Sequence, residues 1–351
     1  MKKQLLIFVA VYASAFALFS ETLQVPPSDP AIRYVGRFTD DFRSGWSGST
    51  IETDFSGTRI SAMLDLLKRG EASYTVVVDG EEKVIFLTPG KQTYLIAEGL
   101  EPGKKHHIVL FRRCEGFFGE VRFEGFEISD DGELSAPPAK NRKMLVVGDS
   151  ITCGYGNEAA TVEEGNSVQN ENGYMSYAAI AARALDADLM MVCWSGRGLY
   201  RNLSPVNDKV DTMPQLFEQT LPIDQTEKWE MSRFIPDVIA INLGTNDTGT
   251  RGGKGPLQKE DYQAAYVKFI KRLRAFAPDS KIIISLGPMT SGHPVETWLL
   301  EIAAQFENVA ALVYPGYEQG ERGGHSHPNL KKDRLMAAQL EKQICEMTGW
   351  E

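Results

Sequence analysis

A serine directly follows a short apolar run in the stretch MLVVGDSITCGYGN, residues 144–157. Such a run is typical of a buried strand, so Ser150 is expected where that strand ends and a helix or loop begins. A hydroxyl in that position is exposed, and nearby backbone amides can stabilise an oxyanion. Gly-Asp-Ser also occurs in ordinary turns, and the G-x-S-x-G elbow of α/β-hydrolases is missing from the chain, so the tripeptide alone is weak evidence for catalysis.

Three later segments supply the other groups that acyl transfer needs, which are backbone N–H donors, a side-chain amide and an imidazole. They are WSGRGLYRN with Gly196 and Gly198, INLGTND with Asn246, and GGHSHPNL with His325 and His327. A nucleophile, oxyanion donors and a base in this order predict hydrolysis of an ester or a thioester. The neighbouring aspartates, Asp149 and Asp247, are expected to organise loops through hydrogen bonds.

The segments that carry these residues alternate between two patterns. MLVVGDS, LMMVCWSG, DVIAINLGTND and KIIISLGP are typical of buried strands, while SYAAIAARALDA and EDYQAAYVKFIKRLRAFAP have helical periodicity. This alternation predicts an α/β domain whose parallel sheet is covered on both faces and binds ligands at the C-terminal ends of its strands. The polar residues at those ends should therefore converge on one crevice.

The first part of the chain has a different pattern. From Ile32 to about Ile128, short apolar-polar alternations lie between glycine, proline and acidic turns, and VVVDGEEKVIF holds an Asp-Gly hairpin signal. Strands at this spacing predict a β-sandwich of jelly-roll type. The segment SDDGELSAPPAKNRK is typical of a linker. We therefore expect a β-sandwich domain over residues 21–137 and the α/β domain over residues 138–351.

The N-terminus has the layout of a secretory signal peptide over residues 1–20. A lysine pair precedes an apolar run from Leu5 to Phe19, and small and polar residues follow; a retained membrane anchor is the alternative. We expect a secreted or periplasmic protein without membrane contact after cleavage. The four cysteines lack the spacing of a disulfide framework or a zinc site. A net charge of −10 argues against nucleic-acid binding.

Five ordered segments resemble the signature blocks of the GDSL/SGNH hydrolase superfamily: GDSITCGYGN, NGYMSYAAIAARAL, WSGRGLYRN, GTND and HPN. Together they resemble carbohydrate esterase family 2, whose members deacetylate plant polysaccharides, and RYVGRF, WSGSTIE and VVVDGE look like that family's N-terminal domain. The resemblance covers roughly residues 32 to 345. It implies a β-sandwich followed by a three-layer α/β/α domain with a parallel sheet, acting without a metal or an organic cofactor.

The resemblance also implies roles for individual residues. Ser150 becomes the nucleophile, and the oxyanion donors become the Ser150 amide, Gly196 and Asn246, with Gly198 in reserve. His327 becomes the base, since the Pro-Asn that follows it matches the family's pattern. The implied function is an exported O-acetyl esterase acting on xylan, glucomannan or their oligosaccharides through an acetyl-enzyme. The alternatives are a lipid, thioester or peptidoglycan esterase on the same fold, and a catalytically weak carbohydrate-binding protein.

The sequence departs from the superfamily's usual pattern just before His327. An aspartate is common two or three residues earlier, but this chain has Gly324 and His325 there. The imidazole must then be oriented by a backbone carbonyl, by Glu318 or Glu321, or by His325. The two histidines are not predicted to bind a metal, because no further ligands complete a site.

Relatives can also carry an aromatic residue just before the catalytic histidine, and this chain has Ser326. A sugar-stacking platform must therefore come from elsewhere. The candidates are Tyr174, Trp194 and Trp298.

Overall fold

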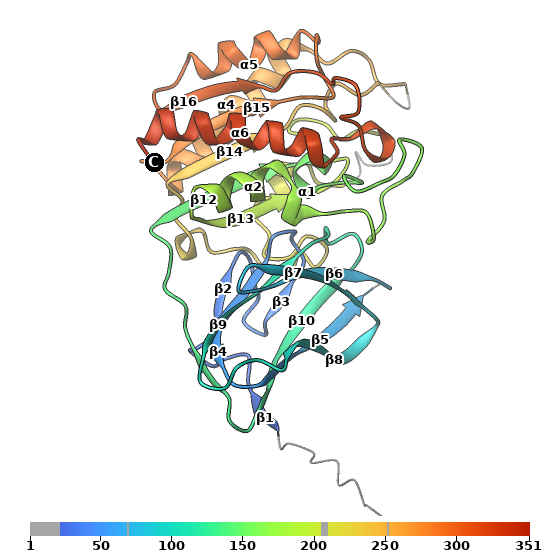
Figure 1. Cartoon of the computed structure of the whole chain (residues 1–351). Helices are drawn as coiled ribbons and strands as arrows, with labels where there is room; N and C mark the ends of the chain where they lie inside the picture. The colour runs from blue at the N-terminus through green and yellow to red at the C-terminus, as the bar shows by residue number, and fades with distance from the viewer. Residues whose placement is uncertain (1–21, 69, 205–209, 251–252) are drawn as a thin grey trace, which may run out of the picture.

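The computed structural model of the chain describes residues 22–68, 70–204, 210–250 and 253–351. Two domains are stacked end to end, with the β-rich N-terminal domain below the α/β domain in Figure 1. The signal peptide predicted over residues 1–20 lies outside the described residues. Within the described ranges, no helix has the length and apolar character needed to cross a membrane.

The N-terminal domain is a β-sandwich of two antiparallel sheets. One sheet has the order β1-β10-β5-β8, with β3 beside β10: Thr22–Val25, Glu120–Ser129, Arg59–Lys68, Gly90–Glu98 and Arg43–Ser44. The other has the order β11-β4-β9-β6-β7, with β2 beside β4: Glu133–Ser135, Thr50–Ser56, Lys105–Arg112, Ala72–Val78, Glu81–Leu87 and Arg33–Val35. Between the sheets lies one apolar core that includes Phe55, Tyr74 and Phe123. The predicted sandwich is thus confirmed.

The predicted hairpin joins β6 to β7 through two residues. Val78 pairs with Glu81, and the turn residues Asp79 and Gly80 have φ values of 51° and 92°. Positive φ at both positions is what a two-residue turn matching the strand twist requires, and Asp-Gly supplies it at little steric cost.

The α/β domain is built on a five-stranded parallel sheet of order β13-β12-β14-β15-β16. Its strands are Ala187–Cys193, Arg142–Gly148, Val238–Asn242, Lys281–Leu286 and Val309–Val313. The first four contain the apolar runs recognised in the sequence, so those predictions are confirmed. The edge strand β16 is an addition, and its five residues are all half-buried.

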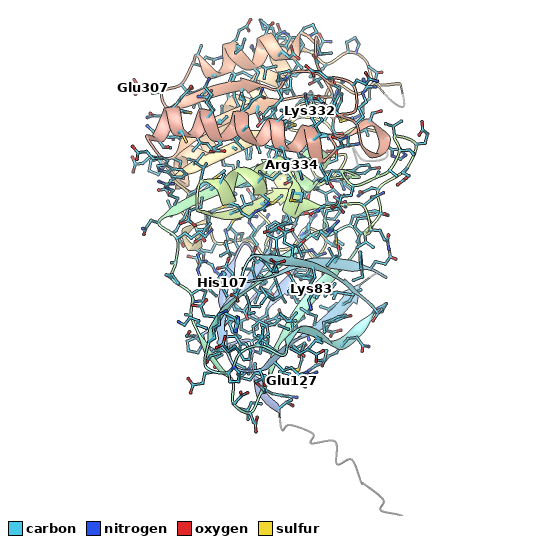
Figure 2. All side chains as sticks on the ribbon, viewed as in Figure 1. Lys83, His107, Glu127, Glu307, Lys332 and Arg334 are labelled. Carbon is cyan, nitrogen blue, oxygen red and sulfur yellow. The ribbon has the colours of Figure 1, made fainter. Side chains whose placement is uncertain are left out.

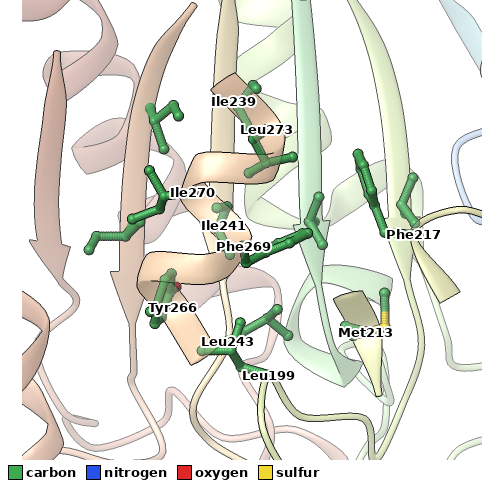
Figure 3. Packing of buried hydrophobic residues seen from close by; sticks show 14 of the residues in the cluster. Leu199, Met213, Phe217, Ile239, Ile241, Leu243, Tyr266, Phe269, Ile270 and Leu273 are labelled. Atoms are coloured by element: carbon green, nitrogen blue, oxygen red, sulfur yellow. The ribbon is translucent and has the colours of Figure 1, made fainter. Parts of the chain in front are cut away.

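Helices cover both faces of this sheet, as the strand alternation predicted. Met144 and Val146 of β12 face α2 (Tyr177–Ala184) and α6 (Leu330–Thr348), whereas Leu145 and Val147 face α4 (Lys259–Phe276) and α5 (Val295–Ala303). Figure 3 shows α4 lying over β14, with the apolar side chains of the helix packed against those of the strand. The helix contributes Tyr266, Phe269, Ile270 and Leu273, and the strand contributes Ile239 and Ile241, with Leu243 directly after it. The domain is therefore a three-layer α/β/α structure.

All four cysteines lie in the described part of the chain as free thiols. Cys114, Cys153 and Cys193 are buried and Cys345 is half-buried, as expected for small apolar side chains without a disulfide framework.

Candidate active site

Ser150 lies at a tight strand-to-helix turn. It follows β12 and opens the short helix α1 (Ser150–Cys153), whose N-cap Asp149 accepts a bond from the Ile151 amide at 3.0 Å. The chain folds back so closely that a Cβ on Gly148 would lie 1.9 Å from Thr152 Oγ1. Because first-turn amides lack partners within a helix, the Ser150 N–H is left available beside its own hydroxyl.

His327 lies near the C-terminal end of the α/β domain and contacts Ser150, which lies near its start. Its Nε2 lies 2.8 Å from Ser150 Oγ, and its Nδ1 lies 3.2 Å from the carbonyl oxygen of Gly324. A carbonyl can only accept, so this contact requires the proton on Nδ1 and leaves Nε2 free to accept the serine proton. The arrangement is that of a nucleophile and its general base.

The orientation of His327 comes from the backbone, which was one of the alternatives that the sequence left open. Glu321 is occupied elsewhere, since its Oε2 accepts from Lys332 Nζ at 3.0 Å and from the Glu318 amide at 3.0 Å. Lys332 lies at the start of α6 and is labelled in Figure 2. No carboxylate in the described residues contacts the imidazole.

Burial sets the protonation state of His327. Burial is the largest cause of a lowered pKa, the bond to the Gly324 carbonyl opposes it, and the nearby His325 adds to it; the net pKa is about 4. The imidazole is therefore neutral at neutral pH and able to act as a base.

Tyr155 is a member of this site that the sequence analysis missed. Its ring stacks on His327 with centroids 4.1 Å apart and an interplanar angle of 26°. Its hydroxyl lies 2.9 Å from Nδ1 of His325. The residue belongs to the GYGN segment just after the serine, but nothing in that segment distinguishes a stacking tyrosine from a loop residue.

The two glycines of WSGRG differ in what their amides do. The Gly198 N–H donates to Asn202 Oδ1 at 3.1 Å, and a Cβ there would lie 2.0 Å from the Arg201 carbonyl oxygen. The Gly196 N–H makes no such bond with any described residue, and its φ of 77° turns the chain sharply after β13. Gly196 is therefore the glycine with an amide available to an oxyanion.

Asn246 follows β14, and its side chain links this part of the chain to the segments that follow β12 and β13. Its Nδ2 donates to Asp149 Oδ2 at 3.0 Å and to the Arg197 carbonyl at 2.8 Å. Both amide hydrogens are thus engaged, and the side chain can reach an oxyanion only by releasing one acceptor. Burial raises the pKa of Asp149 to about 7.

The neighbouring Asp247 organises a loop, as expected. Its carboxylate accepts from the amides of Leu199, Tyr200 and Arg201 at 2.7 to 3.0 Å.

Two family models match the chain. The carbohydrate esterase 2 N-terminal model covers residues 34–138, and the GDSL-like lipase/acylhydrolase model covers residues 146–315. The structure of a family two carbohydrate esterase from Clostridium thermocellum, in complex with cellohexaose, matches with a TM-score of 0.85 at 34% identity, covering 91% of this chain and 100% of that one. The chain belongs to carbohydrate esterase family 2.

Two curated relatives also resemble this family 2 esterase along nearly its whole length. The cellulase/esterase CelE of Acetivibrio thermocellus is 34% identical over 346 residues, which are 94% of this chain and 41% of that protein. The chain thus spans less than half of the length of CelE. An acetylxylan esterase / glucomannan deacetylase of Cellvibrio japonicus is 26% identical over 351 residues, with 98% of this chain and 96% of the relative covered.

The aromatic residues expected to stack on sugars are mostly used for packing in this family 2 esterase. Tyr174 is 7% exposed, with Arg183 3.7 Å above its ring and Phe111 of the β-sandwich 5.2 Å away. Its ring thus packs at the domain interface, and its role at a sugar stays a prediction. Trp194 is 8% exposed and meets Trp46 edge-on at 6.4 Å.

Trp298 is the third candidate for a platform. It lies half-buried on α5, with its ring 6.3 Å from both Tyr262 and His293. Its role at a sugar stays a prediction.

The two histidines near the C-terminus are both engaged within the site, His327 with Ser150 and His325 with Tyr155. Across the described ranges, no group of three or more His, Cys, Asp or Glu side chains is arranged to hold a metal ion.

Proposed function

We propose that this family 2 esterase is exported and removes O-acetyl groups from a plant polysaccharide such as xylan or glucomannan, or from its oligosaccharides. The single observation that carries the proposal is the 2.8 Å contact between Ser150 Oγ and a neutral His327, at the strand ends of a GDSL-type domain. The names of the relatives support the acetylated substrate. The signal-peptide pattern of residues 1–20 supports export to a secreted or periplasmic location.

The reaction begins when Ser150 Oγ attacks the acetyl carbonyl while its proton passes to Nε2 of His327. The oxyanion of the tetrahedral intermediate accepts bonds from the Ser150 and Gly196 amides. Asn246 becomes the third donor when its Nδ2 releases either Asp149 or the Arg197 carbonyl. Collapse of the intermediate breaks the bond to the sugar oxygen, which takes the proton from His327. Water then attacks the acetyl-serine, His327 accepts its proton, and acetate leaves as the serine is restored.

Acetate release by residues 21–351 tests this function on acetylated xylan, acetylated glucomannan and nitrophenyl acetate. We expect Ser150→Ala and His327→Ala each to lower kcat by about a thousandfold or more, because each removes a reacting group. His325→Ala is the matched histidine control and should retain activity within several-fold. Release from nitrophenyl acetate alone would contradict the polysaccharide substrate, and release that persists in Ser150→Ala would contradict the mechanism.

A further inference from the structure

A glutamate of the β-sandwich reaches into the turn that carries Gly196. Glu115 lies three residues after β9, is 1% exposed, and belongs to the N-terminal domain. Its Oε2 accepts from the Ser195 amide at 2.9 Å, and its Oε1 accepts from the Ser195 hydroxyl at 2.5 Å. A single carboxylate therefore holds the residue just before Gly196 at two points.

These two bonds restrict the peptide unit that contains the Gly196 N–H. On one side of that unit, the main chain and side chain of Ser195 are held by Glu115. On the other side, the Gly196 carbonyl accepts from the Leu203 amide at 3.0 Å. Glycine at a φ of 77° is otherwise free to rotate, so the direction of its N–H depends on these contacts.

Glu115 is in turn held firmly between the two domains. Its own amide donates to Glu171 Oε1 of the α/β domain at 2.6 Å, and Arg113 Nε donates to the Glu171 carbonyl at 3.0 Å. The Arg113 carbonyl accepts from Gly173 at 2.8 Å. The sandwich segment 113–115 and the segment 171–173 thus interlock beneath the turn.

Burying a glutamate side chain costs folding free energy unless both of its carboxyl oxygens accept hydrogen bonds. Burial raises the pKa of both Glu115 and Glu171, which reflects that cost. Packing alone would be served better by an apolar side chain of the same volume. Both oxygens of Glu115 instead accept bonds from Ser195, beside the amide that the proposed mechanism uses, and Oε2 also lies 4.0 Å from Cys153 Sγ.

We infer that Glu115 is a positioning residue through which the β-sandwich domain aligns the oxyanion-binding amide of Gly196. This inference rests on the proposed function, because it deepens the role of the same site. The β-sandwich thereby contributes to catalysis without touching the substrate. Loss of Glu115 should weaken transition-state stabilisation more than substrate binding.

Steady-state kinetics of the full chain on nitrophenyl acetate, with active sites titrated, test the inference. We expect Glu115→Ala to lower kcat by about tenfold to a hundredfold, with KM changed by less than about threefold. A displaced Gly196 amide should lower kcat nearly as much as the complete loss of one oxyanion donor. Glu115→Gln should restore most of kcat, because an amide can satisfy Ser195 at both points. Ser195→Ala removes one of the two bonds and should give an intermediate loss; it replaces Glu115→Ala if that variant does not fold.

The matched control is Arg33→Gln, which breaks the ion pair between Arg33 of the sandwich and Asp188 at the opposite end of β13. It should lower the melting temperature but leave kcat unchanged. A kcat loss in Arg33→Gln equal to that in Glu115→Ala, or full kcat in both Glu115→Ala and Ser195→Ala, would overturn the inference. Failure of the proposed function is a different result, namely wild-type turnover that does not depend on Ser150.

Discussion

His327, which contacts Ser150, has a peptide carbonyl at Nδ1, where serine hydrolases commonly have a carboxylate. The Gly324 carbonyl fixes the tautomer and direction of the imidazole through Nδ1. It brings only a partial negative charge, so it stabilises the imidazolium less than an aspartate would. Burial then dominates, which explains why the pKa of His327 falls to about 4.

This low pKa leads to a prediction about the pH dependence of the reaction. Protonated His327 cannot accept the Ser150 proton, so activity is lost as pH falls through its pKa. We expect kcat/KM on nitrophenyl acetate to fall at acidic pH with a midpoint at about 4, the pKa of His327. This midpoint is well below the pKa of roughly 6.5 of an unperturbed histidine. His325→Ala should move this midpoint little, because burial is the main cause. A wild-type midpoint near that of a free histidine would contradict the argument.

Several residues of the site could be predicted from sequence because their types carry the chemistry. Ser150 and His327 follow recognisable segments, and the structure brings them into contact. The Gly324 carbonyl has no sequence signature, since every residue has one. Glu115 lies 80 positions from its partner Ser195 and in another domain. For Tyr174, the residue type does not reveal that Arg183 and Phe111 cover its ring.

At the scale of elements, the strands that end in polar residues were the most predictable. Strands β12 to β15 are largely buried and appear as continuous apolar runs. The edge strand β16 is also an apolar run, VAALV, but it is only half-buried and is followed by Tyr314 and Pro315. Helix α6 is well marked by its N-cap, because Asn329 Oδ1 accepts from the amides of Lys331 and Lys332. That cap sets the start of the helix at Leu330, three residues after His327.

Asp333 on α6 provides an element-scale prediction. Its two carboxyl oxygens accept from the Tyr177 amide at the start of α2 and from Asn157 Nδ2 of the loop after α1, at 3.1 and 3.0 Å. Asp333→Ala leaves both buried donors unpaired, so we expect a loss of about 2 kcal/mol or more in unfolding free energy, measured by urea denaturation. The exposed Lys342→Ala on the same helix should change stability by less than about 0.5 kcal/mol. Equal effects would contradict a bridging role for Asp333.

At the scale of the whole molecule, the two domains share more than a surface contact. Trp46 of the sandwich is 1% exposed and belongs to the core cluster of the α/β domain. Its ring meets Trp194, and its Nε1 donates to the Thr220 carbonyl at 3.0 Å. The buried Arg37 donates to the carbonyls of Phe217 and Gln219, both at 2.7 Å. The β-sandwich therefore completes the core beneath the active site.

This shared core predicts that the two domains unfold together. Calorimetry of residues 21–351 should show one transition whose calorimetric and van't Hoff enthalpies agree. Trp46→Ala removes a large side chain from the α/β core and should lower stability by about 3 to 5 kcal/mol. Trp350→Ala, near the C-terminus and only half-buried, is the matched control and should cost less. Two separate transitions in the wild type would mean that the sandwich is merely attached, because a domain that supplies part of its neighbour's core cannot melt independently of it.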